Sequence, residues 1–360
     1  MIDLLALSKT WKAGQTINLP PGEYQTAGQI FLIGLDGLTL NFPTRTILHA
    51  PPTKSVFEVR SKNVAINGVS VPVGGVVFHV QGDGFRASNF QVGIGSPDGS
   101  VQQAILCENG GTSATFSNFS IGVTASESAY LYTNGCRLLG PFSFAGSQGE
   151  YRIRVSAQGE DSSKRPTGIV ISGGTFPKHE NGPGKPVMDF RDGDGSILAC
   201  EIHGWIGFGE TSFTVPGSAC NINLVGNLFR DCPPGHAYAE LRGGSKVIES
   251  ANTFDQPNGA GAIAVGSGAA LVTSGSSTAF IPQPTAAVPI VHPGGAVMPP
   301  GSAGPQSAAA TAAPTSPPLP NPVQLHGSGV TAGKGIKLAW LVPALLAGLA
   351  LMALALAERA

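Results

Sequence analysis

The chain has 360 residues, a formal net charge of −1 and only 12% charged residues. Nucleic-acid binding needs a basic face that neutralises phosphates, so this composition excludes that class and we expect no nucleic-acid partner. The five cysteines are scattered and form no CxxC pair. Their arrangement argues against a disulfide framework or a zinc site and predicts buried thiols instead.

The first fourteen residues, MIDLLALSKTWKAG, predict a short amphipathic helix. They lack the basic start, the long apolar run and the small-residue cleavage site of a secretory signal. A helix here could cover the open end of a repeat domain, so we assign residues 1–14 as an N-terminal capping helix. The apolar residues that form its buried face are Ile2, Leu4, Leu5, Leu7 and Trp11.

Residues 55–93 contain two copies of one pattern, in which strand-length apolar alternations are separated by Gly or Asn. Gly68 interrupts the first copy, and Asn89, 21 residues later, interrupts the second. A short repeat of this kind is typical of a solenoid, whose turns bury their apolar face only when neighbours stack on them. The pattern recurs along the chain, and we predict a parallel β-helix domain over residues 15–281.

A glycine or polar residue recurs at the same phase of each predicted turn, at intervals of 21 to 33 residues. We expect the shorter intervals to be bare coils and the longer ones to carry inserted loops. No helix-length period of 3.6 residues separates the strands, which argues against a doubly wound α/β fold. The predicted corners are Asn41, Gly68, Asn89, Asn118, Gly140, Gly173, Gly204, Gly226 and Ser250.

Two later segments are nearly identical, Ala-Cys-Glu-Ile at 199–202 and Ala-Cys-Asn-Ile at 219–222. Because they are twenty residues apart, close to the length of a bare coil, we expect Cys200 and Cys220 to lie above one another on adjacent turns. Parallel strands would then hold the two Cα atoms about 4.8 Å apart.

Two N-terminal segments resemble a known family. INLPPGEY (17–24) and GLTLNFPTRTILHAP (37–51) resemble the entry strand and first rung of the pectate-lyase-like right-handed parallel β-helix superfamily, which includes many bacteriophage tailspikes. The resemblance covers about residues 15–260. It implies an all-β fold, a right-handed single-stranded parallel β-helix of about nine or ten coils. Many tailspike-like helices are trimers, so a homotrimer is a further expectation of the resemblance.

The composition changes abruptly towards the C-terminus, because residues 256–333 contain no Asp, Glu, Lys or Arg. Residues 260–281 keep a weak strand pattern and predict the last one or two rungs. Residues 282–335 are rich in Pro, Ala, Ser and Gly and contain few bulky apolar side chains. Such a segment buries too little apolar surface to offset chain entropy, so we predict a disordered linker.

The segment LAWLVPALLAGLALMALALA (338–357) is uncharged and mostly apolar. At about 1.5 Å per residue it spans the roughly 30 Å hydrocarbon core of a bilayer. We therefore predict one transmembrane helix over residues 336–357, which anchors the protein in a membrane. Lys334 and Lys337 precede it, and by the positive-inside rule they keep the N-terminal part on the cytoplasmic side.

Charged residues concentrate in residues 150–201, which hold 15 of the 39 charged residues that lie before the uncharged segment. Alternate side chains of a strand point to opposite faces, so in EYRIRV we expect Arg152 and Arg154 to point outward. In PVMDFRDGDG the same rule predicts Asp189 and Arg191 outward, beside these arginines. Together with Arg154, the candidate binding residues are Glu160, Asp161, Lys164, Arg165, His179 and Lys185.

The charged segment resembles β-helix polysaccharide lyases, which hold Ca²⁺ with outward carboxylates and use Arg or Lys to remove a proton next to a uronate carboxylate. The resemblance implies a Ca²⁺ ion bound by Asp189, Asp192 and Asp194, since a hard cation prefers oxygen ligands. It also implies Arg152, Asp189 and Arg191 as catalytic residues. The residues by themselves leave another interpretation open, an outward ladder of ion pairs that each contribute about 0–1 kcal/mol to stability.

Two functions remain open at this stage. The first is a membrane-anchored surface or attachment protein, carried by a phage or virion, that recognises a polysaccharide or glycan. The alternative is a polysaccharide lyase or glycoside hydrolase that acts on acidic polysaccharide. The hydrolase branch of the family carries paired Asp and Gly-His-Gly motifs that this chain lacks, and His203 and His236 stand alone. The incomplete motifs and the predicted anchor favour the first function.

Overall fold

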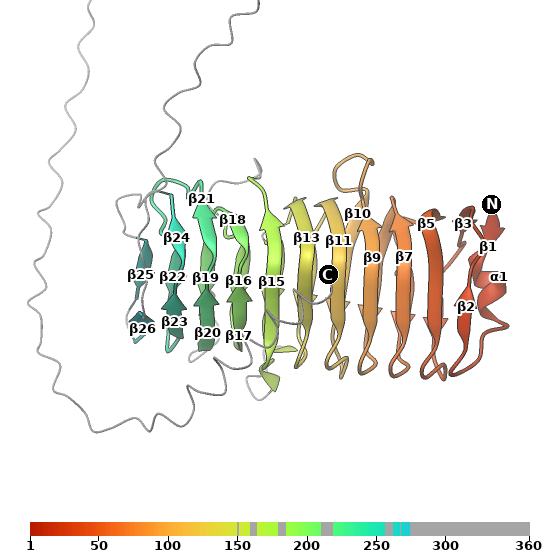
Figure 1. Cartoon of the computed structure of the whole chain (residues 1–360), viewed down its shortest axis with the longest axis horizontal. Helices are drawn as coiled ribbons and strands as arrows, with labels where there is room; N and C mark the ends of the chain where they lie inside the picture. The colour runs from red at the N-terminus through yellow and green to blue at the C-terminus, as the bar shows by residue number, and fades with distance from the viewer. Residues whose placement is uncertain are drawn as a thin grey trace, which may run out of the picture. The chain divides into compact units, whose positions relative to one another are not determined.

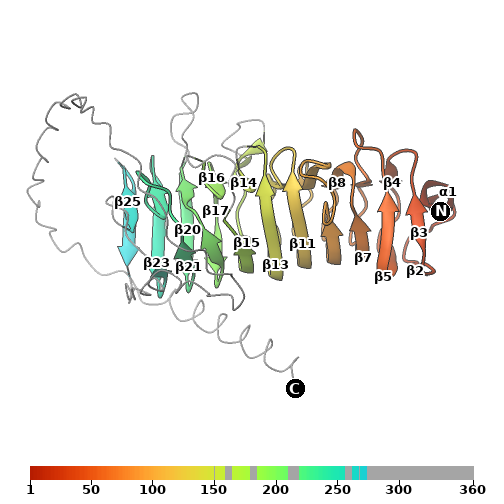
Figure 2. The same cartoon turned by 90° about the horizontal axis from the view of Figure 1, so that it is seen from above.

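The computed structural model describes residues 1–149, 151–158, 164–178, 185–209, 219–255, 262–266 and 268–273. These residues form a parallel β-helix built from two sheets, and every strand pairing in it is parallel. The strands lie side by side along one axis (Figures 1 and 2). The predicted linker (282–335) and transmembrane helix (336–357) lie outside the described residues. Within the described ranges, no helix is long and apolar enough to cross a membrane.

Sheet B has ten strands, and each turn of the solenoid contributes one of them. The prediction of a parallel β-helix with nine or ten coils is therefore confirmed. The sheet B strands are β4 (Ile30–Leu32), β6 (Phe57–Val59), β8 (Gly74–Val80), β10 (Val101–Cys107), β12 (Ala129–Leu131), β14 (Ile153–Val155), β16 (Met188–Phe190), β19 (Ile206–Phe208), β22 (Ala239–Leu241) and β25 (Ile263–Val265).

Sheet A has sixteen strands, because several turns contribute a strand that bends or divides in two. They are β1 (Ile2–Asp3), β2 (Thr16–Asn18), β3 (Glu23–Gln25), β5 (Thr39–His49), β7 (Ala65–Val71), β9 (Arg86–Val92), β11 (Thr115–Thr124), β13 (Arg137–Ser147), β15 (Ile169–Phe176), β17 (Gly193–Leu198), β18 (Glu201–His203), β20 (Cys220–Val225), β21 (Leu228–Arg230), β23 (Lys246–Ser250), β24 (Thr253–Phe254) and β26 (Ala270–Thr273).

The N-terminal helix is α1 (Leu4–Ser8), and it lies at the N-terminal end of the solenoid (Figure 1). The Asp3 side chain accepts a hydrogen bond from the amide of Ala6 and caps the helix, which satisfies a backbone donor that has no partner within the helix. Leu4 is fully buried. The helix is shorter than the predicted 1–14, because residues Ile2–Asp3 instead pair with β3 as a strand.

The predicted corners correspond to one column of residues along sheet A, where the backbone turns through the left-handed region. Asn89 and Asn118 have φ values of 55° and 49°, and Gly68 has a φ of 88°. Asn and Gly tolerate this region better than other residues, which explains the recurring pattern. The prediction is wrong at three positions. Ala199 and Ala251 occupy the column in place of Gly204 and Ser250, and Asn41 pairs with Asn67, one position before Gly68.

The expected stacking of Cys200 on Cys220 is also wrong. Cys220 begins β20 and pairs with Gly193 of β17, whereas Cys200 follows the corner of its turn and its amide bonds the side chain of Asn227. The two similar tetrapeptides therefore lie at different positions of their coils. Both thiols are buried and not in a disulfide, as predicted, and burial raises the pKa of Cys200 to about 11 and that of Cys220 to about 12.

The core between the sheets is filled by aliphatic and aromatic side chains that stack from turn to turn. Phe90, Phe119 and Phe142 lie on three successive turns, with ring centroids 4.8 and 4.9 Å apart and planes within 6° of parallel. Phe144 and Phe176 form a similar stack. One turn cannot bury its apolar face alone. The stacked rings bury a large apolar area between successive turns, and this burial stabilises the stacking of the turns.

Candidate functional site

The outer face of sheet B carries a column of aligned side chains, one per turn, which we call the outer column. Its members alternate with buried residues along each strand; Tyr130, for example, lies between Ala129 and Leu131, which are fully buried. Strand alternation therefore turns the column away from the core. The outer column comprises Phe31, Glu58, His79, Leu106, Tyr130, Arg154, Asp189, Gly207, Glu240 and Ala264.

The middle of the outer column combines two tyrosines with an arginine. The rings of Tyr130 and Tyr132 lie nearly parallel, with centroids 5.3 Å apart. The Arg154 guanidinium lies over the Tyr130 ring, 5.7 Å from its centroid. All three side chains are partly exposed. Among the residues that the structure describes, Arg154 has no ion-pair or hydrogen-bond partner, and its Nε atom is buried.

Glu127 supports this group from the loop that directly precedes β12. Burial alone would raise the pKa of its carboxyl, but hydrogen bonds from Tyr130 and Ser126 lower that pKa below its ordinary value. Burial, followed by the bond to Glu127, raises the pKa of Tyr130. At neutral pH Glu127 is therefore an anion and Tyr130 a neutral donor, which holds the tyrosine ring in one orientation.

Asp189 and Arg191 form an ion pair on the next turn. The Arg191 Nε and Asp189 Oδ2 atoms are 2.7 Å apart, and Arg191 also donates to the Tyr151 hydroxyl at 3.1 Å. Burial would lower the pKa of Arg191, but the bond to Asp189 raises it above its ordinary value. An arginine held in its charged form cannot accept a proton, so this geometry does not support Arg191 as a general base.

The strand register places Arg154 directly beside Asp189, as the alternation predicts. Arg152 departs from the prediction that it points outward, because it precedes β14 at a turn and lies beside Val187. Its side chain is only 4% exposed and donates to the Phe144 carbonyl at 3.2 Å. Burial lowers its pKa to about 10, so Arg152 stays charged at neutral pH beneath the surface, away from a ligand.

The three aspartates proposed as calcium ligands are distributed over two ion pairs. Asp189 contacts Arg191. Asp192 and Asp194, which lie at the start of β17, both contact Arg165. Asp194 also accepts hydrogen bonds from the backbone and side chain of Asn221. No group of three or more His, Cys, Asp or Glu residues within the described ranges could hold a metal ion, so the calcium prediction gains no support.

The structure describes three of the remaining candidate binding residues, Lys164, Arg165 and Lys185. Lys164 and Lys185 are exposed, and Arg165 is partly buried by its aspartate partners. Glu160, Asp161 and His179 lie outside the described residues. The structure therefore brings Arg154, Asp189 and Arg191 together on sheet B.

Sequence reasoning missed the aromatic part of the site. The sequence Ala-Tyr-Leu-Tyr at 129–132 has tyrosines two residues apart between small or apolar residues, a strand pattern that places both rings on the outer face. The charged residues that guided the prediction lie in residues 150–201, whereas residues 129–132 carry no charge. His79 also lies in the outer column and is 2.8 Å from a Glu108 oxygen.

The two histidines that stand alone in sequence have partners in the structure. His203 lies between Asp231 and Glu201, 2.6 and 3.2 Å from their carboxylate oxygens. His236 stacks on Trp205 with ring centroids 4.4 Å apart and contacts Glu240 at 2.8 Å. Both are satisfied polar residues, as the sequence predicts.

The fold and the outer column define the class of protein: a parallel β-helix with polar and aromatic side chains aligned on one outer face. Its sequence matches no protein-family model and no curated protein.

Several solved structures are similar to the chain. ORF18 of Geobacillus virus E2 is 15% identical over 72% of this chain and 52% of its own, with a TM-score of 0.49, so the chain spans about half the length of that protein. PfbA, a surface adhesin of Streptococcus pneumoniae, is 11% identical over 76% and 74%, with a TM-score of 0.44. The Agl-KA catalytic domain is 14% identical over 73% and 60%, with a TM-score of 0.40. At these identities the similarity concerns the fold alone.

Proposed function

We propose that this β-helix recognises an acidic glycan with the middle of the outer column. The observation that carries the proposal is Arg154, a partly exposed arginine without an ion-pair or hydrogen-bond partner among the described residues, beside the Tyr130–Tyr132 stack. A guanidinium that forms no hydrogen bond within the described residues matches a carboxylate or sulfate group, which it binds through charge-assisted hydrogen bonds.

The tyrosines suit the remainder of a sugar ring. Tyrosine combines a large apolar face with a hydroxyl, so it can pack against the C–H face of a pyranose and hydrogen-bond its hydroxyl groups. Because Tyr130 is held by Glu127, its ring loses little conformational entropy when a ligand binds. His79 of the outer column and Glu108, directly after β10, lie on adjacent turns and extend the polar surface along the solenoid axis.

We further propose that the protein is a surface or attachment protein, carried by a phage or virion, in which residues 282–335 link the β-helix to a membrane anchor at 338–357. Three features support this proposal. They are the uncharged segment at 256–333, the apolar segment at 338–357, and the recognition face on the solenoid. A linker of this composition lets the β-helix reach a ligand away from the membrane.

The anchor has a direct test. The full chain is expected to sediment with membranes and to need detergent for extraction, whereas a chain truncated after residue 285 should be soluble without detergent, because it lacks the apolar segment. The measurement is fractionation by ultracentrifugation at physiological salt. Full-length protein in the soluble fraction would contradict the anchor.

The glycan proposal is tested by calorimetric titration with polygalacturonate and alginate, and with dextran as a neutral polymer. We expect the acidic polymers to bind and Arg154→Gln to weaken their binding about tenfold or more, since a charge-assisted hydrogen bond contributes roughly 1.5–3 kcal/mol. Higher salt should also weaken binding.

The matched control is Arg137→Gln, which removes an exposed arginine from sheet A and should leave binding unchanged. Equal affinity of Arg154→Gln and the wild-type chain for the acidic polymers would contradict the proposal. The lyase alternative would be indicated in the same samples by unsaturated products that absorb in the ultraviolet. We favour recognition because Asp189 holds Arg191 in its charged form.

A further inference from the structure

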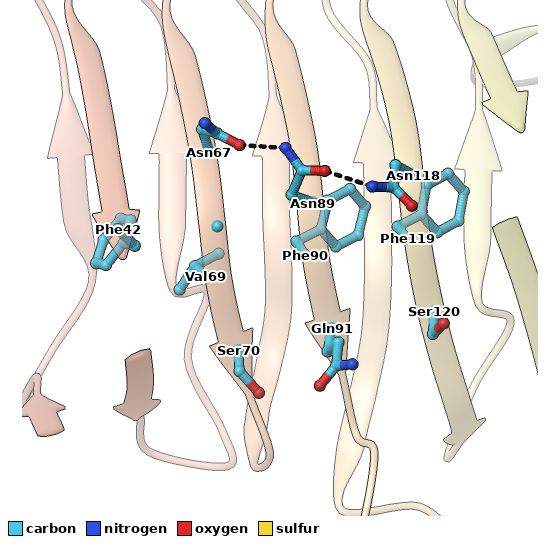
Figure 3. Close-up of a pocket in the computed structure, with 11 residues that line it drawn as sticks. Phe42, Asn67, Val69, Ser70, Asn89, Phe90, Gln91, Asn118, Phe119 and Ser120 are labelled. Atoms are coloured by element: carbon cyan, nitrogen blue, oxygen red, sulfur yellow. Dashed lines mark hydrogen bonds between the residues drawn. The ribbon is translucent and has the colours of Figure 1, made fainter. Parts of the chain in front are cut away.

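A second surface, on sheet A, carries a groove that the proposed function does not use. It has a volume of about 590 Å³ and crosses β5, β7, β9 and β11, so it runs along the solenoid axis (Figure 3). Its eleven lining residues are all uncharged. We call it the sheet A groove.

One wall of the groove is a row of asparagine amides. Asn89 donates to the Asn67 side-chain oxygen at 2.7 Å, and Asn118 donates to that of Asn89 (Figure 3). Each amide group has two N–H donors, and each of these bonds uses one of them. The row therefore presents further donors and acceptors to solvent at the spacing of parallel strands, about 4.8 Å.

The opposite wall is formed by Ser70, Gln91 and Ser120, which lie on the same three turns (Figure 3). Within the described part of the chain, these three side chains form no hydrogen bond. Both walls thus offer hydroxyl and amide groups that repeat from one turn to the next and that a ligand could engage.

The floor and one end of the groove are closed by the backbone. Phe90 and Phe119, at 1% and 3% exposure, turn their rings into the core, so the backbone of these two residues forms the floor. Gly68 lies where a Cβ atom would be 2.1 Å from the Phe42 carbonyl oxygen. The irregular stretch of β5 therefore folds against Gly68 and closes the end, which only glycine permits.

We propose that the sheet A groove binds an uncharged, extended glycan that lies along the solenoid axis. The hydroxyl groups of such a glycan repeat regularly, and they can hydrogen-bond to the uncharged amides and hydroxyls of both walls. An extended peptide fits poorly, because it would pair with a free sheet edge, whereas the backbone of β7, β9 and β11 is already paired on both sides. This site is separate from the outer column, and neither proposal depends on the other.

The length of the groove sets the expected ligand size. Four strands span three inter-strand spacings, about 14 Å. We expect affinity of the full-length protein for cello- and chito-oligosaccharides to rise from the disaccharide and to level off near the trisaccharide, because longer chains extend beyond the groove. Maltohexaose, which curls, should bind at least about tenfold more weakly than cellohexaose or chitohexaose.

The decisive variant is Gln91→Trp, which places a bulky ring in the groove from an exposed position. We expect it to reduce hexasaccharide binding at least about tenfold in calorimetric titration. Asn89→Gly, which tolerates the left-handed backbone but removes the central amide, should also weaken binding. Gln102→Trp introduces the same ring at an exposed position of β10 in sheet B and should bind like the wild-type chain, as should Arg154→Gln.

Circular dichroism and thermal unfolding establish that each variant keeps the fold. The proposal is overturned if none of these oligosaccharides binds, or if Gln91→Trp binds them as the wild-type chain does. It is equally overturned if Gln91→Trp changes the oligomeric state in light scattering while no oligosaccharide binds, because the groove would then be a contact between copies.

Discussion

Replacement of Phe119 by alanine is expected to lower the free energy of unfolding by about 3–5 kcal/mol, the usual range for a buried phenylalanine. Its ring is stacked between Phe90 and Phe142 at 4.8 and 4.9 Å and also contacts Phe144 edge to face. The substitution leaves a cavity that the parallel strands on both sides, held by their backbone ladders, cannot close.

The measurement is urea unfolding of the wild-type and variant chains, followed by circular dichroism. Phe31→Ala is the control, because Phe31 is 51% exposed on the outer column, and its loss should change stability by less than about 1 kcal/mol. An equally small change in the free energy of unfolding for Phe119→Ala would contradict the prediction and show that the turns repack around the cavity. An unchanged slope of the transition is needed for the comparison.

Replacement of Asp189 by asparagine should also cost about 3–5 kcal/mol, because it removes the buried carboxylate of the ion pair with Arg191. The Asp189 side chain is 1% exposed and that of Arg191 is 17% exposed. The sequence alone suggested an exposed ladder of ion pairs, for which the expected cost was at most about 1 kcal/mol. Because Asp189 is buried, the expected loss of unfolding free energy is larger than for an exposed ion pair.

The double variant Asp189→Asn/Arg191→Gln distinguishes a buried ion pair from an exposed one. We expect it to recover part of the lost stability relative to Asp189→Asn, since it also removes the partly buried charge of Arg191. Arg242→Gln serves as the exposed comparison, because Arg242 is 45% exposed and pairs with Glu240 at 2.7 Å. Its loss should cost no more than about 1 kcal/mol. Equal effects of Asp189→Asn and Arg242→Gln in urea unfolding would contradict the buried-pair interpretation.

Several features of the molecule follow from local sequence alone. Apolar alternation and a short repeat with Gly or Asn corners predict the parallel β-helix, because backbone conformation at Asn89 or Asn118 depends on the residue itself. The same alternation predicts that Arg154 and Asp189 lie side by side on the outer face, which the strand register confirms. The burial of the five cysteines also follows from composition.

The phase of the later coils and the composition of the binding face depend on tertiary structure. Inserted loops of different length separate the turns, so similarity between the tetrapeptides around Cys200 and Cys220 does not reveal which residues are neighbours. Tyr132 and Arg154 lie 22 positions apart in the chain and form one surface only because successive turns stack. Whether Asp189 is exposed or buried likewise depends on what packs over it.

The sequence by itself thus determined the type of fold, because periodicity and corner residues act within one turn. Only the tertiary structure decided which side chains converge, that Arg152 is buried while Arg154 forms no ion pair or hydrogen bond within the described ranges, and that Asp189 is not grouped with Asp192 and Asp194. The physical reason is that burial and charge pairing arise between turns, and the register between turns is set by packing along the whole solenoid.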